Sequence, residues 1–249
     1  MSIYEYLWHI DFPEERNLIE SEYIVFLIKL AKKMLGKSYR RILDLACGTG
    51  RYHKYLREDG FEVYGVDLNE ELIRLAKKRN KGFEDYYKVE DMRSINYIEE
   101  FDVVLNWYTS FGYFSDEDNK LVLRNALRAL RPKGILILDV PIAWREGIQI
   151  VEHGDDYVEI SKSIKISKYT FNFHSRLFRR RGDNLEFVNE LRVKLTVYPP
   201  KVLKQMLESI GFRFLYAFAN RGTWLARSFD LADLVREGVR RLTWIVYRD

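Results

Sequence analysis

The first half of the chain alternates between two patterns of hydrophobic and polar positions. In Glu15 to Leu35 the apolar residues recur near helical spacing, which predicts an amphipathic helix ended by Gly36. From residue 40 onward, short apolar runs alternate with polar segments typical of helices. The runs cover residues 42–46, 63–66, 86–89, 101–106 and 135–140. Strands buried on both faces and joined by crossover helices form a parallel, doubly wound sheet, so we expect an α/β fold.

Capping residues support the helices between these runs. Asn69 precedes two glutamates, and Ser115 precedes three acidic residues, as the positive end of a helix dipole favours. The sequence Arg-Pro-Lys-Gly at 131–134 predicts a stop after the second of these helices.

The pattern changes after Trp144. Residues 160–173 alternate between polar and apolar positions, and 185–198 form another long strand-like run after the turn sequence at 181–184. We therefore expect an antiparallel β appendage inserted after the fifth strand. Beyond it the sequence predicts a helix at 198–210 ended by Gly211, a strand at 212–218, a helix at 231–240 and a last strand at 242–247.

Composition indicates a folded, globular protein. Hydrophobic residues make up 47% of the 249 positions and charged residues 31%. No apolar run reaches the ~18 residues that span a bilayer, so we expect no membrane association and a cytoplasmic location. The single cysteine, Cys47, forms no internal disulfide and is expected to be structural. The abundance of Lys, Arg and Glu, with only two Gln, is compatible with a thermophilic source.

Positive charge is concentrated in one part of the chain. Residues 161–213 contain 12 Lys or Arg against 4 Asp or Glu, whereas the whole chain has a net charge of +4. Such a basic stripe is typical of a solvated face, a collar for an acidic small molecule or a nucleic-acid footprint.

A glycine-containing loop follows the first predicted strand. The strand ends in Asp44, and the loop continues as Ala46, Cys47, Gly48, Thr49 and Gly50 just before a helix. Glycines let the backbone turn tightly and approach a ligand, while the helix start presents unpaired N–H groups. His53 stands where a dinucleotide-binding loop needs a small residue, which disfavours NAD or FAD, and no Walker lysine follows.

Polar residues also end the next three strands. Asp67 lies 17 positions after Gly50, where a carboxylate accepts ribose hydroxyls or caps the following helix; both roles are compatible. Asp91 and Asn106 end the third and fourth strands. Because ligands of open α/β sheets bind at the carboxyl ends of the strands, we expect these side chains to border one crevice.

With these motifs the chain resembles the class I S-adenosylmethionine-dependent methyltransferases, motif I being Leu43 to Gly50. The resemblance covers residues 42–140 closely and 198–218 loosely. It implies a mostly parallel seven-stranded sheet and the cofactor S-adenosyl-L-methionine, released as S-adenosyl-L-homocysteine after in-line methyl transfer. It also implies an N-terminal lid helix at 1–36, a cofactor-binding domain at 37–144 and 198–249, and a substrate-recognition insertion at 145–197.

The resemblance assigns cofactor-binding roles in chain order. Asp44 and the glycine loop hold the amino-acid part, Asp67 binds the ribose, and Asp91 with the backbone of Met92 recognises adenine. Asn106 lies beside the methyl end. The implied cofactor-binding residues are Asp44, Ala46, Cys47, Gly48, Thr49, Gly50, Asp67, Leu68, Asp91, Met92, Asn106 and Trp107.

The sequence says less about the methyl acceptor than about the cofactor. The residues after Asn106 are Trp-Tyr-Thr and not Pro-Pro-Tyr, which puts methylation of base amino groups or glutamine amides in doubt. Because Cys47 lies within motif I, the thiolate mechanism of C5-pyrimidine methylation is excluded. A general base is optional for this reaction, and no catalytic residue is assigned; candidates are Tyr108, Tyr113, His153 and His174, each favoured as structural.

Substrate-pocket candidates come from three segments. They are Tyr6 and Trp8 in the lid, Tyr108 and Tyr113 after the fourth strand, and His174 and Arg176 in the appendage. The basic appendage predicts a small, acidic acceptor. The alternatives are an RNA methyltransferase and a regulatory protein that binds the cofactor without catalysis. We expect no metal, and the sequence does not predict an oligomeric state.

Overall fold

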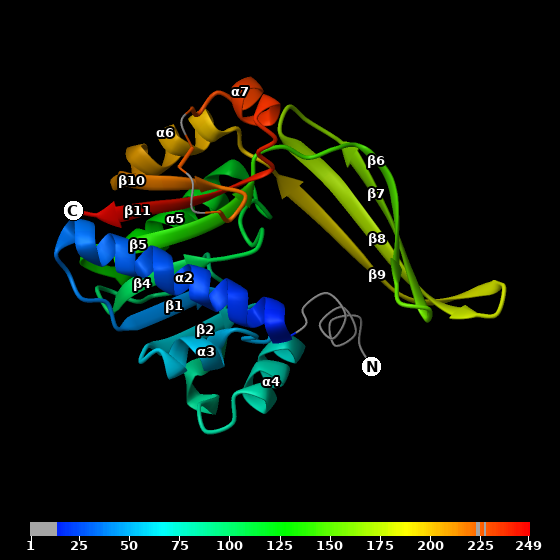
Figure 1. The fold of residues 1–249 in the computed structure, drawn as a ribbon, viewed down its shortest axis with the longest axis horizontal. Helices are drawn as coiled ribbons and strands as arrows, with labels where there is room; N and C mark the ends of the chain where they lie inside the picture. Colours follow the sequence, from blue (N-terminus) through cyan, green and yellow to red (C-terminus); the bar gives the residue numbers. More distant parts are fainter. Residues whose placement is uncertain (1–13, 223–224, 227) are drawn as a thin grey trace.

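The computed structural model describes residues 14–222, 225, 226 and 228–249, and these build two separate β-sheets (Figure 1). Its first half contains α2 (Glu14–Leu35), β1 (Arg41–Leu45), α3 (His53–Glu58), β2 (Glu62–Asp67), α4 (Glu70–Arg79), η1 (Glu84–Tyr86), β3 (Tyr87–Val89), β4 (Phe101–Asn106), α5 (Asp116–Ala129) and β5 (Leu130–Pro141). Its second half contains β6 (Gly147–His153), β7 (Tyr157–Lys165), β8 (Thr170–Arg181), β9 (Asn184–Thr196), α6 (Pro200–Ile210), β10 (Phe212–Ala219), α7 (Leu231–Arg236) and β11 (Arg241–Arg248).

The larger sheet has the order β10-β11-β5-β4-β1-β2-β3, and β11 alone runs against its neighbours. This confirms the mostly parallel, seven-stranded sheet expected from the sequence. All six residues of β4 are buried, with Val103 and Leu105 packing beneath α2 and α3 while Val104 packs beneath α5 and α6. Helices therefore cover both faces, which explains the continuous apolar runs.

The smaller sheet is antiparallel, has the order β6-β7-β8-β9 and extends away from the larger one (Figure 1). Its insertion after β5 confirms the predicted appendage. At its base, the Thr196 N–H donates to the Gly112 carbonyl over 2.7 Å. A Cβ at Gly112 would lie 2.2 Å from the Thr196 carbonyl oxygen, so a glycine is required where the loop after β4 meets β9.

The strands of the appendage differ from the prediction in two ways. The run 160–173 is two strands, β7 and β8, because Thr170 O accepts from the N–H groups of Ile166 and Ser167 and closes a turn that lacks glycine and proline. Strand β6 was missed. The predicted stop of the second helix is confirmed, since α5 ends at Ala129. Residues 131–134 themselves lie inside β5, where the register against β4 shifts.

Helix α7 also ends earlier than predicted, at Arg236. None of the described helices is long and apolar enough to cross a membrane.

Candidate active site

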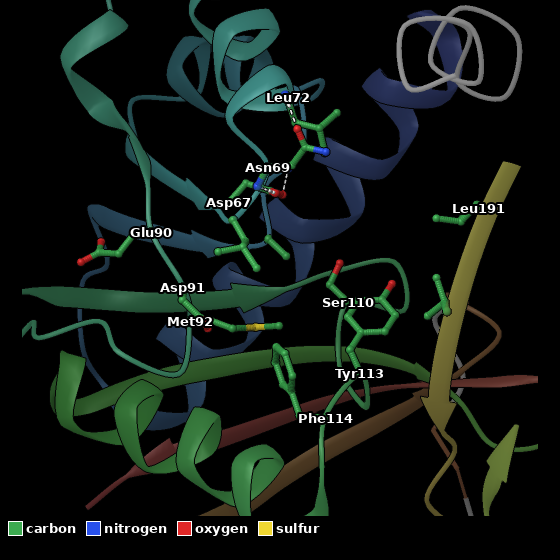
Figure 2. Close-up of a pocket in the computed structure, with 14 residues that line it drawn as sticks. Asp67, Asn69, Leu72, Glu90, Asp91, Met92, Ser110, Tyr113, Phe114 and Leu191 are labelled. Carbon is green, nitrogen blue, oxygen red and sulfur yellow. Dashed lines mark hydrogen bonds between the residues drawn. The ribbon is translucent and has the colours of Figure 1, made fainter. Parts of the chain in front are cut away.

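A cavity of about 440 Å³ opens at the carboxyl edge of the larger sheet, between this edge and β9 (Figure 2). Its volume is within the range of cofactor and small-molecule sites. The lining residues are Ala46, Gly48, Asp67, Leu68, Asn69, Leu72, Glu90, Asp91, Met92, Ser110, Tyr113, Phe114, Leu191 and Val193. They come from the ends of β1, β2 and β3, from α4, from the loop after β4 and from β9.

Asp67 anchors the cavity at the end of β2. One carboxylate oxygen accepts from the Gly48 N–H and the other from the Asn69 N–H, both over 2.9 Å. The cap of α4 is Asn69, whose side chain accepts from the N–H groups of Glu71 and Leu72. Asp67 therefore does not cap the helix. Burial raises the pKa of its carboxyl, although the two backbone donors partly oppose this shift.

The glycine loop is held in a left-handed backbone conformation. Ala46, Gly48 and Gly50 have φ of 56°, 56° and 58°. A Cβ on Gly48 would enter open space, so this backbone is accessible from the cavity. A Cβ on Gly50 would instead lie 2.8 Å from the Tyr87 hydroxyl oxygen. The two glycines thus serve different needs, since Gly48 faces the cavity and Gly50 allows close packing.

Asp44 lies behind the loop and does not line the cavity. Its Oδ2 accepts from the Tyr52 hydroxyl over 2.6 Å and contacts His53 Nε2 over 2.9 Å. The other imidazole nitrogen of His53 lies 2.8 Å from the Tyr87 hydroxyl. Burial lowers the pKa of His53, even though Asp44 favours its protonated form. His53 therefore braces the loop as a neutral residue between Asp44 and Tyr87.

Three oxygen atoms near this edge are buried and have no hydrogen-bond partner within the described ranges. They are Asp44 Oδ1, Thr49 Oγ1 and Asn106 Oδ1. Asn106 follows Leu105, which pairs with Asp44 across the adjoining strands β1 and β4. Unsatisfied buried acceptors are costly, so this edge of the sheet is suited to a ligand that donates hydrogen bonds.

The far wall of the cavity is formed by residues after β3. Arg93 holds the Asp91 carboxylate through two nitrogens, at 3.0 and 2.6 Å, and lowers the pKa of that carboxyl. Glu90 accepts from the Tyr97 hydroxyl over 3.0 Å. Both acids therefore line the cavity with their carboxylates engaged by other side chains. The apolar part of the lining is formed by Leu68, Leu72, Met92 and Phe114.

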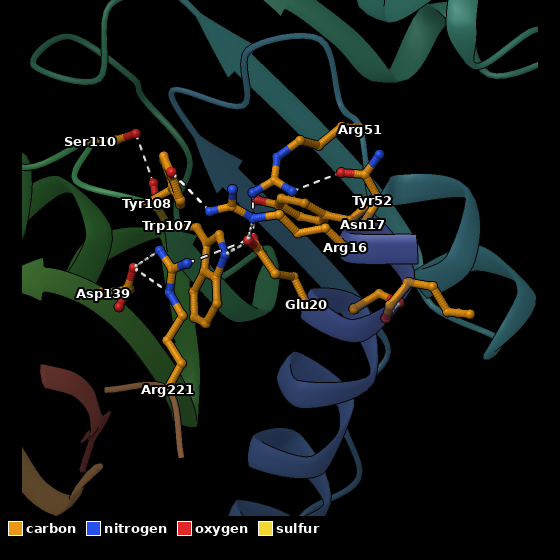
Figure 3. A network of polar contacts seen from close by, with 12 residues as sticks. Arg16, Asn17, Glu20, Arg51, Tyr52, Trp107, Tyr108, Ser110, Asp139 and Arg221 are labelled. Atoms are coloured by element: carbon orange, nitrogen blue, oxygen red, sulfur yellow. Dashed lines mark hydrogen bonds and ion pairs between the residues drawn. The ribbon is translucent and has the colours of Figure 1, made fainter. Parts of the chain in front are cut away.

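Trp107 belongs to a buried polar network beside the cavity and does not line the cavity itself (Figure 3). Its indole N–H donates to Glu20 of α2 over 2.7 Å, and Glu20 is also paired with Arg51 and Arg221. Arg221 in turn contacts Asp139, the fully buried acid near the end of β5, over 2.6 Å. This network ties α2, the glycine loop, β5 and the loop after β10 together.

Tyr108 lies among the cations of the same network. The guanidinium carbons of Arg16, Arg51, Arg221 and Arg241 lie 5.2, 5.5, 4.6 and 5.7 Å from the centroid of its ring. Its φ of 57° is unusual for a bulky residue, and strained backbone of this kind is concentrated at functional sites.

The two faces of the appendage differ in chemistry. Leu191 and Val193 line the cavity, and strand pairing places Phe173 and Ser175 on the same, inner face. Further inner-face residues are Glu159, Ser161 and Ser163 of β7. The outer face carries Lys162, His174, Arg176, Arg192 and Lys194. These side chains therefore point away from the cavity, whereas the same pairing places Lys165, Arg179 and Arg181 on the inner face.

The structure brings together some of the predicted site residues and not others. Of the cofactor-binding set it places Ala46, Gly48, Asp67, Leu68, Asp91 and Met92 in the cavity lining, with Tyr113 from the substrate set. His174 and Arg176 lie on the outer face, where both contact Glu190, at 2.8 and 3.7 Å. Cys47 packs in a small core with Ile73 and Tyr87, and burial raises its pKa. Tyr6 and Trp8 lie outside the described residues.

Sequence reasoning missed several lining residues. Asn69, Leu72, Glu90, Leu191 and Val193 were not assigned to the site. Leu72 could have been found, since it lies one helical turn after the Asn69 cap. Among the described side chains, no three His, Cys, Asp or Glu residues are grouped as metal ligands would be.

Comparisons with known proteins agree with this geometry. Residues 42–134 match the methyltransferase-domain family. A Bacillus subtilis protein named as a methyltransferase, YqeM, is 29% identical over 70% of this chain and 73% of its own length. Mouse glycine N-methyltransferase is 27% identical over 53% of this chain, which spans only 50% of that enzyme.

Similarity to solved structures extends over the whole chain. The S-adenosylmethionine-bound CalS10, an amino pentose methyltransferase from Micromonospora echinaspora, superposes with a TM-score of 0.72 at 17% identity. The match covers 100% of this chain and 98% of CalS10. At this identity the likeness shows the fold, including the appendage.

Proposed function

This chain belongs to the class I S-adenosylmethionine-dependent methyltransferases, and from that premise we propose that its cavity binds S-adenosylmethionine and that its acceptor is a small-molecule amine. The observation that carries the cofactor assignment is the arrangement of Asp67 and Gly48 at adjoining strand ends. The assignment of the acceptor rests on the chemistry of the surrounding side chains.

The Asp67 carboxylate fits a ribose. Each of its oxygens already accepts one backbone N–H and retains a lone pair for a hydroxyl donor. The two backbone bonds fix the direction of those lone pairs, and Asp67 lines the cavity. Open space above Gly48 lets the cofactor approach the backbone. Leu68, Met92 and Phe114 supply apolar surface for the adenine ring.

The methionine end of the cofactor fits the buried acceptors at β1. Its ammonium group requires hydrogen-bond acceptors, and Asp44 Oδ1 and Thr49 Oγ1 are buried oxygens without partners in the described part of the chain. His53 and Tyr52 hold the Asp44 carboxylate in place. Asp44 and the glycine loop therefore hold the amino-acid part of the cofactor.

The cofactor supplies an electrophilic methyl group on a positively charged sulfur. The protein's task is to align the acceptor nitrogen and exclude water. Asn106 Oδ1 serves the alignment, because it is a buried acceptor at the end of β4 that has no partner among the described residues and can accept an N–H of the substrate. Its amide is oriented by the Ser110 carbonyl, which lies 3.4 Å from Nδ2.

A nitrogen acceptor agrees with two of the similar proteins whose names specify a substrate. Mouse glycine N-methyltransferase acts on an amine, and CalS10 is named as acting on an amino pentose. The inner face of the appendage adds the hydroxyls of Ser161, Ser163 and Ser175, which suit a hydroxylated acceptor. An acidic acceptor has less support than the basic appendage suggested, because no cation of β7 to β9 lines the cavity. Strand pairing places Lys162, Arg176, Arg192 and Lys194 on the outer face, and Lys165, Arg179 and Arg181 on the inner face away from the cavity lining.

The test has two parts. Calorimetry should show micromolar binding of S-adenosylmethionine and S-adenosylhomocysteine but not of NADH. Release of S-adenosylhomocysteine is then measured with glycine, amino sugars, the matching hydroxy compounds without nitrogen, and bulk RNA. Turnover with an amine and not with its hydroxy analogue supports the proposal. Turnover with RNA alone, or tighter binding of NADH, would overturn it.

A further inference from the structure

The turn after β4 contains two consecutive residues in the left-handed backbone region. Tyr108 and Thr109 have φ of 57° and 67°. This region is unfavourable for residues with a Cβ, and most unfavourable for β-branched residues such as threonine. Strained backbone persists only where the surrounding structure fixes it, and it is concentrated at functional sites. The conformation of Thr109 must therefore be held by contacts with the rest of the molecule.

The buried ion pair near the end of β5 holds Thr109 from two directions. The Thr109 N–H donates to the Asp139 carbonyl over 3.1 Å. Its hydroxyl oxygen accepts from Nη1 of Arg241 over 2.8 Å, and Nη2 of the same arginine lies 2.7 Å from the Asp139 carboxylate. Hydrogen bonds from a charged donor are stronger than those between neutral groups, so this contact offsets part of the strain. Both the backbone and the side chain of Thr109 are thus fixed to the end of the larger sheet.

The next residue, Ser110, connects the turn to the cavity. Ser110 lines the cavity, and its hydroxyl donates to the Trp107 carbonyl over 2.8 Å (Figure 3). The Ser110 carbonyl accepts from Nδ2 of Asn106 over 3.4 Å. Asn106 is 2% exposed, and its Oδ1 has no hydrogen-bond partner in the described part of the chain. The position of the Ser110 carbonyl therefore decides in which direction the Asn106 amide presents Oδ1.

We propose that Thr109 is a positioning residue for methyl transfer. Its left-handed conformation sets the position of the Ser110 carbonyl, and this carbonyl orients the Asn106 amide toward the acceptor nitrogen. The inference rests on the proposed function, in which Asn106 aligns the acceptor amine. Thr109 itself does not line the cavity, so it acts through Asn106. Loss of its conformation should lower kcat and leave the affinity for S-adenosylmethionine unchanged.

Two substitutions of Thr109 test whether the conformation must be held or only permitted. Asparagine tolerates the left-handed region and offers an oxygen to Arg241, so Thr109→Asn should keep kcat within about threefold of the wild type. Glycine adopts this region but does not fix it, so Thr109→Gly should lower kcat by about tenfold or more, as small misplacements of aligned groups do. The kcat is measured from S-adenosylhomocysteine release with the amine that the acceptor screen identifies, and calorimetry should show wild-type cofactor affinity in both variants.

A matched control lies at the opposite edge of the larger sheet. Lys133 is exposed near the start of β5 and has φ of 57°. Lys133→Gly makes the same kind of backbone change far from the cavity and should leave kcat unchanged.

A double variant tests whether Thr109 acts through Asn106. In an Asn106→Ala background, adding Thr109→Gly should lower kcat by no more than about twofold further, whereas independent effects would multiply. Hydrogen exchange over residues 106–112, followed by mass spectrometry, needs no acceptor. It should be faster in Thr109→Gly than in the wild type and Thr109→Asn.

These measurements separate the positioning role from the proposed function. A wild type that binds no cofactor or methylates no amine would refute the proposed function, and exchange would still decide whether Thr109 holds the turn. The positioning role would be overturned by wild-type kcat in Thr109→Gly, by equal losses in Thr109→Asn or Lys133→Gly, by multiplying effects in the double variant, or by unchanged exchange.

Discussion

The carboxyl edge of the seven-stranded sheet and the four-stranded appendage position their side chains by different means. In the larger sheet, strands buried on both faces put polar residues only at their ends, so the place of Asp67 follows from the end of β2. In the appendage, successive residues alternate between faces, so the place of Arg176 depends on register. A one-residue change of register moves a side chain to the other face. Residues that end buried strands are therefore assigned more securely than residues within an alternating strand.

The ion pairs of the two regions differ in how deeply they are buried. Asp139 is fully buried and contacts Arg221 and Arg241 at 2.6 and 2.7 Å, whereas Glu190 in the appendage is a partly exposed partner of His174 and Arg192. Removing one member of a buried network leaves uncompensated charge, whereas exposed pairs contribute little.

The largest expected effect is therefore on folding stability. Asp139→Asn should lower the free energy of unfolding by about 3 kcal/mol or more, because two guanidinium groups lose their counter-ion. Glu190→Gln, the matched change in the appendage, should leave the denaturant midpoint unchanged. Urea unfolding followed by tryptophan fluorescence measures both variants, and equal losses would show that the two networks do not differ in strength.

The Asp139 carboxylate should also make the folding stability sensitive to acid. Burial alone would raise the pKa of Asp139, but Arg241 and Arg221 hold it below its ordinary value of 3.8. A carboxyl with a lower pKa in the folded state contributes stability above pH 3.8, and this contribution is lost as pH falls through the folded value. Wild-type stability should thus fall below pH 3.8 more steeply than that of Asp139→Asn. Parallel pH profiles for the two proteins would contradict this assignment.

The next largest effect concerns cofactor affinity. Asp67→Ala removes the proposed ribose acceptor and leaves the N–H groups of Gly48 and Asn69 without their partner. We expect S-adenosylmethionine binding to weaken by about 100-fold, as for loss of hydrogen bonds to a charged group. Calorimetry measures this, with Glu90→Gln as the control, because the Glu90 carboxylate in the same cavity is already bonded to Tyr97. Similar affinities for the two variants would refute the ribose assignment.

A smaller effect is expected in the glycine loop. Gly48→Ala places a Cβ in the open space of the cavity and should weaken cofactor binding by about tenfold, with about 1 kcal/mol of backbone strain. Gly36→Ala is a matched control, since Gly36 has φ of 65° and equally open surroundings at the end of α2. Both variants should lose similar stability, but only Gly48→Ala should lose affinity. A loss of cofactor affinity in both variants would mean that backbone strain, and not contact with the ligand, explains the effect.

The sequence was most informative where local signals and fold agreed. The bounds of β4 and the cap at Asn69 match the structure, because a buried apolar run and a capping side chain are local features. The glycine loop and the Asp67 carboxylate lie at the cavity because strand order alone brings adjoining strand ends together.

The features that the sequence did not predict depend on contacts between residues far apart in the chain. Arg221 meets Glu20 across 201 positions of the chain, and no periodic pattern encodes that pairing. In the appendage, an alternating pattern continued through the turn before Thr170 and hid the break between β7 and β8. The basic residues were therefore read as one surface beside the ligand, whereas pairing divides them between the outer face and the inner face, and none of them lines the cavity.

The smallest effect separates the two faces of the appendage. Leu191→Ala removes three carbon atoms from the cavity wall and should raise KM for the amine that the acceptor screen identifies by about tenfold, since loss of apolar contact in a pocket is worth at least this much. Arg176→Ala, on the outer face, should leave both kcat and KM unchanged within about twofold, because its guanidinium contacts Glu190 and not the cavity. Affinity for S-adenosylmethionine, measured on both variants, shows whether the cofactor site is intact. A higher KM in Arg176→Ala with Leu191→Ala unaffected would mean that the acceptor binds at the outer face, and the prediction of an acidic acceptor made from the sequence would regain its support.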